Sequence, residues 1–420
     1  MAVIASRGDT MHTNIRFDHQ LLAVEGEHDV HCMLELDAPA APPTDRAPLH
    51  LALVVDRSGS MQGDKLAAAR DAARFLASHL RPTDELALVA FDDEVELVAP
   101  LAPADPARLA AAIATIDARG LTNLSGGWLK GLEELNRASG DGVRRVLLLT
   151  DGQANEGITD RTQLEQIAAG TRARAGTTTV GFGEGFDEEL LTAIAEHSNG
   201  NTYFAASPED APGIFAEEFE GLATLVAQNV SVEIRPAESV ELLGVLNDYP
   251  IVEVPGGAQA QLGDAFGGER RRLVFAMHVP QLAALGPARI ADVVLRYVAV
   301  GDEVAAHELT LPVTVNLVSA DEAAVAELDA EVNDEIWLLR AARARNEAIA
   351  DFDDGDYEAG SNKMLGIRDL LLSAAPQSSR GDELLAEAAS LAESADVHAM
   401  DDPMWRKRNR NLAWRRQRGR

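Results

Sequence analysis

Five oxygen-bearing side chains stand out in the first half of the chain: the carboxylates Asp56 and Asp151 and the hydroxyls Ser58, Ser60 and Thr122. The first acid ends the apolar run LHLALVVD, the second ends RRVLLLTD, and the threonine lies in RGLTNLSGG, before an expected helix. A set of oxygen donors with little charge is what a hard divalent cation such as Mg²⁺ selects. The sequence therefore predicts a cation site, provided that the fold brings the three segments together.

The pattern around these segments predicts an α/β domain over residues 49–228. The runs LHLALVVD, ELALVAF, RRVLLLTD and TTTVGF carry no central charge, which is typical of strands buried on both faces of a parallel sheet. Between them, segments such as DKLAAARDAARFLASHL show the three- and four-residue spacing of amphipathic helices. We predict a doubly wound, mostly parallel sheet. Ligands of such sheets bind at the carboxyl ends of the strands, where Asp56 and Asp151 are expected.

The regions on either side of this domain are typical of antiparallel β structure. Residues 1–48 contain NIRFD, LLAVEG and VHCMLELDA, and residues 229–318 contain NVSVEIRP, RRLVFAMHVP and HELTLPVTVNLV. Two or three strands alone are marginally stable, so we expect the N-terminal segment to complete the later β-sandwich, with the α/β domain inserted in it. We expect a helical hairpin over residues 319–398, starting with one long helix over SADEAAVAELDAEVNDEIWLLRAARARNEAIADF, and a basic tail over residues 399–420.

The charge, the apolar runs and the cysteine content indicate which cellular compartment and which class of partner to expect. The formal net charge of −31 argues against a protein that coats nucleic acid. No apolar run reaches the 18 or so residues of a membrane-spanning helix, and the N-terminus lacks a secretory pattern. The single Cys32 allows no internal disulfide and fits a reducing compartment. We therefore expect a cytoplasmic protein that does not insert into membranes.

The last segment reverses the charge of the rest of the chain. WRKRNRNLAWRRQRGR, residues 405–420, carries eight Arg or Lys residues and no acid. It could contact nucleic acid, dock on a partner, or fold onto the acidic body of its own chain, and a solvated, disordered end is a further possibility. The acidic remainder favours docking over nucleic acid.

The order D-x-S-x-S, then T, then T-D-G on an α/β pattern resembles the von Willebrand factor A (VWA) domain with its metal-ion-dependent adhesion site (MIDAS). The resemblance covers roughly residues 49–226, and all five positions match. More loosely, the whole chain is similar to bacterial single-chain proteins of this superfamily and to the inter-alpha-trypsin inhibitor heavy chains. The resemblance implies that Ser58, Ser60 and Thr122 bind Mg²⁺ directly or through one water, while Asp56 and Asp151 act partly through water. Mn²⁺ and Ca²⁺ are alternative ions.

In this family the remaining cation ligand is a carboxylate of a partner protein, so the resemblance implies a non-enzymatic module that captures a partner presenting Asp or Glu. Two alternatives stay open: a metal-dependent hydrolase using the same cation, and a scaffold with an unused site. The chain has no G-x-S-x-G, H-E-x-x-H or P-loop motif, which disfavours an enzyme. A purely structural role for Asp56 and Asp151, as helix caps, would leave Ser60 and Thr122 unexplained.

Overall fold

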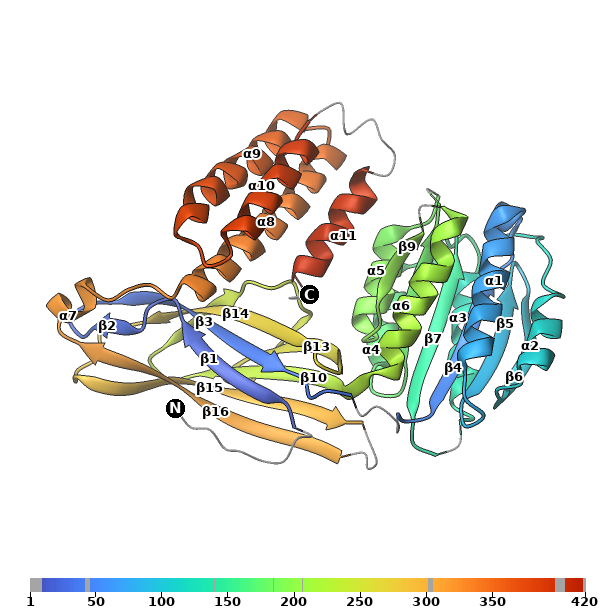
Figure 1. Ribbon diagram of the computed structural model, residues 1–420, viewed down its shortest axis with the longest axis horizontal. Helices are drawn as coiled ribbons and strands as arrows, with labels where there is room; N and C mark the ends of the chain where they lie inside the picture. The colour runs from blue at the N-terminus through green and yellow to red at the C-terminus, as the bar shows by residue number, and fades with distance from the viewer. Residues whose placement is uncertain are drawn as a thin grey trace.

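The computed structural model describes residues 10–41, 46–138, 140–183, 185–205, 207–300, 305–396 and 405–417. Parts of the predicted N-terminal segment (1–9 and 42–45) and of the predicted basic tail (399–404 and 418–420) lie outside the described residues. The chain forms three bodies: a β-sandwich and an α/β domain lie side by side along the long axis, and a helical bundle lies above the sandwich (Figure 1).

The α/β domain is built on a six-stranded sheet of order β6-β5-β4-β7-β8-β9, in which only β6 runs antiparallel to its neighbour. Its strands are β4 (Leu49–Asp56), β5 (Glu85–Phe91), β6 (Val95–Pro103), β7 (Val143–Thr150), β8 (Gly176–Phe182) and β9 (Thr202–Ala205). All eight residues of β4 are buried, because helices cover both faces of the sheet. This arrangement confirms the predicted doubly wound, mostly parallel fold.

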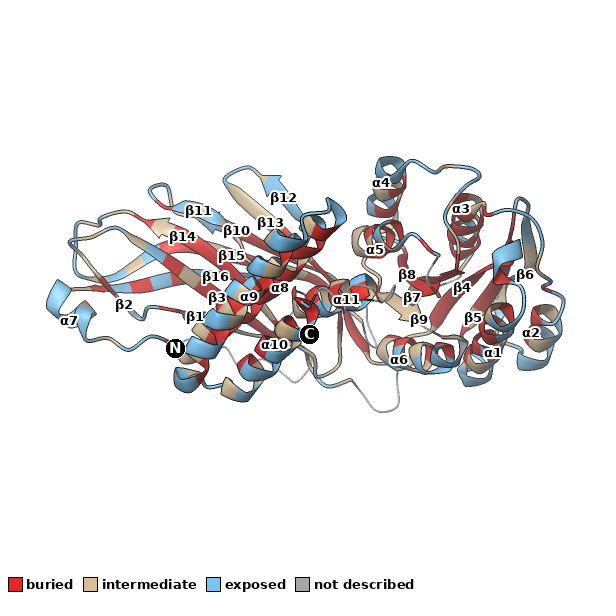
Figure 2. Cartoon of the chain, turned by 90° about the horizontal axis from the view of Figure 1, so that it is seen from above, coloured by how far each residue is buried: buried red, intermediate tan, exposed pale blue. Residues whose placement is uncertain are grey.

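Two separate apolar cores lie on the two faces of this sheet, as Figure 2 shows. Leu51 and Leu53 of β4 pack toward one core, whereas the alternating residues Ala52 and Val54 pack toward the other. The first core is covered by α1 (Asp64–His79), α2 (Pro106–Ile113) and α6 (Ala211–Ala223). The second is covered by α3 (Leu124–Leu135), α4 (Arg161–Thr171) and α5 (Glu188–His197).

The sandwich consists of two sheets to which the beginning and the middle of the chain both contribute. One sheet has the order β1-β3-β14-β11 and contains β1 (His12–Phe17), β3 (His28–Asp37), β11 (Glu241–Val245) and β14 (Arg270–Val279). The other has the order β12-β13-β10-β15-β16-β2 and contains β2 (Leu21–Ala23), β10 (Leu225–Pro236), β12 (Ile251–Val254), β13 (Gly257–Phe266), β15 (Gly286–Ala299) and β16 (Ala305–Val318).

Pairing of β3 with β14 and of β2 with β16 ties the N-terminal segment to the later strands. The α/β domain is therefore an insertion in the sandwich, as predicted. The reason is burial: the inner faces of β3, β14 and β10 share one apolar core that none of them could close alone.

The C-terminal region contains five described helices rather than a simple hairpin. They are α7 (Ala320–Ala324), α8 (Ala330–Asp353), α9 (Tyr357–Ala374), α10 (Gly381–Ser394) and α11 (Trp405–Gln417). The single long helix expected from residue 319 was wrong. The chain breaks before Asp329, whose side chain caps α8 by accepting hydrogen bonds from the amides of Glu331 and Val332 and also pairs with Arg16 of β1. No helix in the described part of the chain is long and apolar enough to cross a bilayer.

Candidate metal centre

The carboxylate of Asp56 lies at the carboxyl end of the central strand β4, fully buried between β5 and β7. Its Oδ1 accepts a 2.7 Å hydrogen bond from the Ser58 amide, and its Oδ2 accepts one from the Thr150 hydroxyl of β7. The chain then forms a short 3₁₀ turn, η1 (Gly59–Met61), which carries Ser60. Gly63 then leads the backbone into α1. Its φ of 87° is a conformation that favours glycine.

The neighbouring parallel strand β7 ends beside this turn and supplies Asp151. The Ser60 hydroxyl donates to Asp151 Oδ1 at 2.7 Å and lies 3.1 Å from the Ser58 hydroxyl. The Asp151 and Ser58 side chains are buried, whereas Ser60 is exposed. Two carboxylates and two hydroxyls are therefore linked at one edge of the sheet, with an open side at Ser60.

Thr122 reaches the same edge from the loop before α3. A methyl group placed on Gly152 would lie 3.2 Å from Thr122 Oγ1 and 3.8 Å from Asp56 Oδ2, so one glycine touches both side chains. The Thr122 amide donates to Asn155 Oδ1 at 2.9 Å, which fixes the loop against the segment after β7. The structure thus brings the five predicted side chains to one edge, as expected for carboxyl ends of neighbouring parallel strands.

The electrostatics of this edge favour a bound positive charge. Burial raises the pKa of Asp56 to about 6, and the nearby Asp151 carboxylate adds to the rise, while hydrogen bonds from Thr150 and Ser58 oppose it. Removing two carboxylates from water is unfavourable unless a cation compensates for their charge. A divalent ion would meet this need.

Comparison with known proteins assigns the domain. Residues 51–153 match the model of the von Willebrand factor type A domain. The chain contains a VWA domain. An uncharacterized protein of Synechocystis is 27% identical over 341 residues, covering 76% of this chain and 77% of that protein. Bovine inter-alpha-trypsin inhibitor heavy chain H1 is 31% identical over 202 residues, 46% of this chain, but the match spans only 22% of the heavy chain.

Solved structures extend the likeness in fold beyond the VWA domain itself. A von Willebrand factor type A protein from Catenulispora acidiphila has a TM-score of 0.72 at 17% identity, covering 93% of this chain and 98% of the other. The ArnB paralog VWA2 from Sulfolobus acidocaldarius has a TM-score of 0.62 at 16% identity, with 97% and 98% covered. At such identities the likeness shows the fold alone.

Two side chains of this edge were missed by the sequence reasoning. Lys65, in the first turn of α1, places its ammonium on Asp151 Oδ2. Thr150, which directly precedes Asp151, donates to Asp56. The position of Thr150 in the run RRVLLLTD was a usable signal, because it is the last residue of a strand adjacent to β4. Lys65 gave no such signal, since a lysine in a helix is usually solvated.

The donor set fits a hard cation better than a soft one. No group of three His, Cys, Asp or Glu residues suited to a metal exists within the described parts of the chain, so any ion at this edge needs hydroxyl ligands. Thr122 is only 4% exposed, yet its hydroxyl makes no hydrogen bond to any described residue. The oxygen of this hydroxyl is therefore available as a ligand for an ion or a water. Ser58, Ser60 and Thr122 could therefore hold Mg²⁺, with Asp56 and Asp151 balancing its charge.

Proposed function

We propose that the VWA domain captures a carboxylate of a partner protein through a divalent cation, Mg²⁺ in the first instance, held by Ser58, Ser60 and Thr122 with Asp56 and Asp151. The observation that supports this most is the convergence of three hydroxyls and two carboxylates from three separate loops at one partly open edge. Mg²⁺ binds about six oxygens and usually keeps some waters, which a partner's Asp or Glu can replace.

The surroundings of the site offer space for such a partner. A groove of about 630 Å³ begins at Gln153, two residues after Asp151, and continues along the start of α5 to α11. A partner segment that placed its acid on the cation could extend along this groove.

A hydrolytic role has less support. A metal-dependent hydrolase needs a general base within hydrogen-bond reach of the attacking water. Within the described part of the chain, the hydrogen-bond partners of the five side chains are hydroxyls, backbone amides, the Lys65 ammonium and, for Ser60, the Asp151 carboxylate, with no imidazole among them. In the proposed site the Asp151 carboxylate balances the charge of the cation, which leaves no separate base. Binding without turnover therefore agrees best with the arrangement.

The test combines cation binding with partner capture by the full chain. Calorimetry should show that Mg²⁺ binds the wild type. Asp56→Ala and Thr122→Ala should each weaken binding by at least about 10-fold, because changes to the outer-shell partners of a metal already cost about 10–100-fold. The charge-matched control for Asp56→Ala is Asp71→Ala, which removes an exposed acid of α1 that pairs with Arg74 and should bind normally.

Capture of proteins from a lysate by the immobilised chain should require Mg²⁺ and should stop in EDTA. Amidation of the carboxyl groups in the lysate before the experiment should abolish it as well, because the partner's acid is the proposed ligand. Capture that survives EDTA and both variants would overturn the proposal.

A further inference from the structure

Helix α11 lies between the helical bundle and the VWA domain, although it is the last described element of the chain (Figure 1). Its face toward the bundle is buried, with Trp405 4% and Ala413 1% exposed. On this face the Asn409 side chain accepts a hydrogen bond from the Arg345 guanidinium of α8. Its other face carries basic side chains toward α5. The segment that could have bound nucleic acid is thus placed against acidic surfaces of its own chain.

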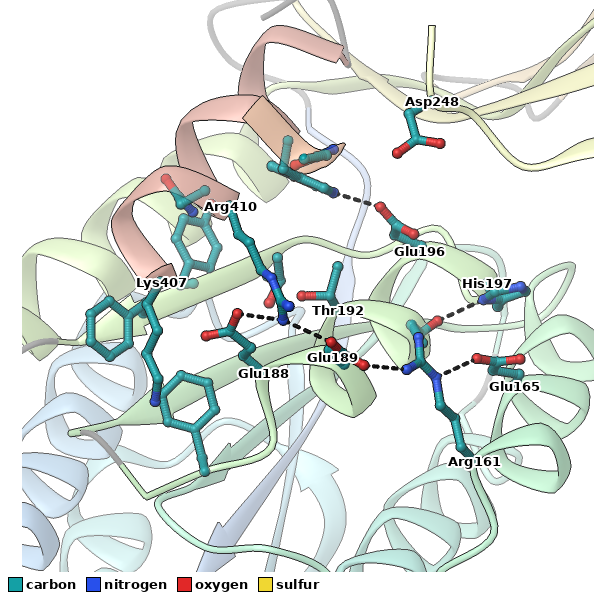
Figure 3. A pocket seen from close by; sticks show the side chains of 18 residues that line it. Arg161, Glu165, Glu188, Glu189, Thr192, Glu196, His197, Asp248, Lys407 and Arg410 are labelled. Atoms are coloured by element: carbon teal, nitrogen blue, oxygen red, sulfur yellow. Dashed lines mark hydrogen bonds and ion pairs between the residues drawn. The ribbon is translucent and has the colours of Figure 1, made fainter. Parts of the chain in front are cut away.

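The contacts of α11 with the VWA domain are mostly ionic. Arg410 lies 2.7 Å from Glu188 and 2.9 Å from Glu189 at the start of α5, and the Trp414 indole donates to Glu196 at 2.8 Å (Figure 3). A cavity of about 310 Å³ separates the two surfaces around these pairs. Partly exposed ion pairs are weak and screened by salt. The VWA side of α11 can therefore separate while the bundle side stays packed.

Lys407 makes the contact nearest to the metal centre. Its ammonium lies 3.7 Å from the centre of the Phe186 ring and 5.4 Å from that of Phe204, a cation–π arrangement. It also donates to the Gly183 carbonyl at 3.4 Å. Gly183 follows β8 directly, at the same sheet edge as Asp151.

The backbone that Lys407 contacts lies close to the metal centre. A methyl group placed on Gly183 would lie 3.5 Å from Lys65 Cε and 3.7 Å from its Nζ. One placed on Gly185 would lie 3.3 Å from the Asp151 carbonyl oxygen. The Gly183 backbone that Lys407 contacts therefore lies beside the Lys65 side chain, and the Lys65 ammonium contacts the Asp151 carboxylate.

We propose that α11 is an intramolecular latch that lowers the cation affinity of the VWA site. The inference rests on the proposed function of that site. With Lys407 in place, the Gly183 segment stays beside Lys65 and favours the position of its ammonium on Asp151, where the ammonium competes with a divalent ion for the carboxylate and repels it. When the latch opens, Lys65, which is already 35% exposed, can turn to solvent and leave Asp151 to the ion.

Coupling between two sites is reciprocal, so cation binding must loosen α11 by the same factor by which α11 weakens cation binding. A partner that occupies the groove beside Gln153 would meet Arg406, Lys407 and Arg410 on α11 and could open the latch as it binds. Capture of a partner and loading of the ion would then support each other.

Lys407→Ala in the full chain tests the latch. Isothermal calorimetry with MgCl₂ should show binding about 5–150-fold tighter than in the wild type, the usual range for coupled sites. Arg415→Ala removes one positive charge from the same helix at an exposed position, 3.9 Å from Glu217 and away from Gly183, and should match the wild type. Equal affinity of the Lys407→Ala variant and the wild type would overturn the latch and leave the proposed function standing.

A second experiment uses Lys65→Ala to test whether α11 acts through the Lys65 ammonium. This variant should bind Mg²⁺ more tightly, and adding Lys407→Ala to it should change little, because the ammonium through which α11 acts is gone. Full additivity of the two changes would contradict the mechanism. If neither the wild type nor any variant binds Mg²⁺, the proposed function itself fails.

Hydrogen exchange measured in the same protein gives the reciprocal readout. Amides of α11 should exchange faster in Mg²⁺ than in EDTA, while those of α8 should not change. Exchange in α11 that is slower or unchanged with saturating Mg²⁺ would overturn the latch.

Discussion

The buried ion pair between Arg145 and Asp264 joins the VWA domain to the sandwich and allows a quantitative test of the structure. Arg145, on β7, places Nη2 2.6 Å from Asp264 Oδ2 of β13 and donates from Nη1 to the Asn199 carbonyl at 2.7 Å. The two side chains are 1% and 7% exposed. An arginine that is so fully buried cannot recover hydration when its partner is removed.

The expected cost follows from this burial. Asp264→Ala should lower the free energy of unfolding by about 3–5 kcal/mol, because it leaves the Arg145 charge buried with only neutral acceptors. The joint replacement Arg145→Met with Asp264→Leu should cost much less than either single change, since it removes both charges at once. The partly exposed ion pair of Asp292, 26% exposed, with Arg289, 59% exposed, is the control: Asp292→Ala should cost about 0–1 kcal/mol.

Urea unfolding followed by tryptophan fluorescence and by circular dichroism provides the assay, because two probes reveal whether the domains unfold together. A cost below about 1 kcal/mol for Asp264→Ala would refute the reasoning, since it would show that water reaches Arg145. Simple additivity in the double variant would refute it too, because the pair would then not interact.

Two further predictions concern packing and acid stability. Gly127→Ala should destabilise the folded protein by about 1–3 kcal/mol, because the new methyl would lie 2.5 Å from the Phe91 ring. Gly366→Ala, in open space on α9, should stabilise it by about 0.5–1 kcal/mol. Thermal unfolding of both variants checks this, and equal effects would contradict it. Burial acts to raise the pKa of Asp84, but hydrogen bonds from Arg46 and from backbone amides outweigh it and hold the pKa below 3.8. The difference in the free energy of unfolding between the wild type and Asp84→Asn should therefore be constant near neutral pH and should shrink as the pH falls below 3.8. Urea unfolding midpoints measured across this pH range check the prediction, and a difference independent of pH would count against it.

The sandwich and the α/β domain were predictable because the spacing of apolar residues along their strands matches the spacing of the buried positions. Apart from His50, β4 is apolar up to Asp56, since both faces of its sheet are covered. The second half of β16 alternates between buried and exposed residues, since only one face of its sheet is covered. The break before Asp329 was not predictable from periodicity. The apolar spacing continues through it, and tertiary contacts fix the break: Asp329 pairs with Arg16, 313 residues away, and its amide donates to the Asp18 carbonyl at 3.0 Å.

The same division applies to the candidate site. Asp56, Ser58, Ser60, Thr122 and Asp151 could be named from residue types and strand ends, and whether they bind Mg²⁺ stays a prediction. Lys65 and Lys407 could not be named, because a lysine on an amphipathic helix has the same pattern whether it faces solvent, a carboxylate or an aromatic ring.

The sequence by itself determined the local order of this protein: which segments become strands and helices, which acids end a buried strand, and that one segment carries the positive charge. These properties depend on the period and type of neighbouring residues. Only the tertiary structure decided where the basic helix lies, which lysine meets Asp151 and which charges are joined across domains. Such contacts depend on the distances between segments far apart in the chain, and no local pattern encodes those distances.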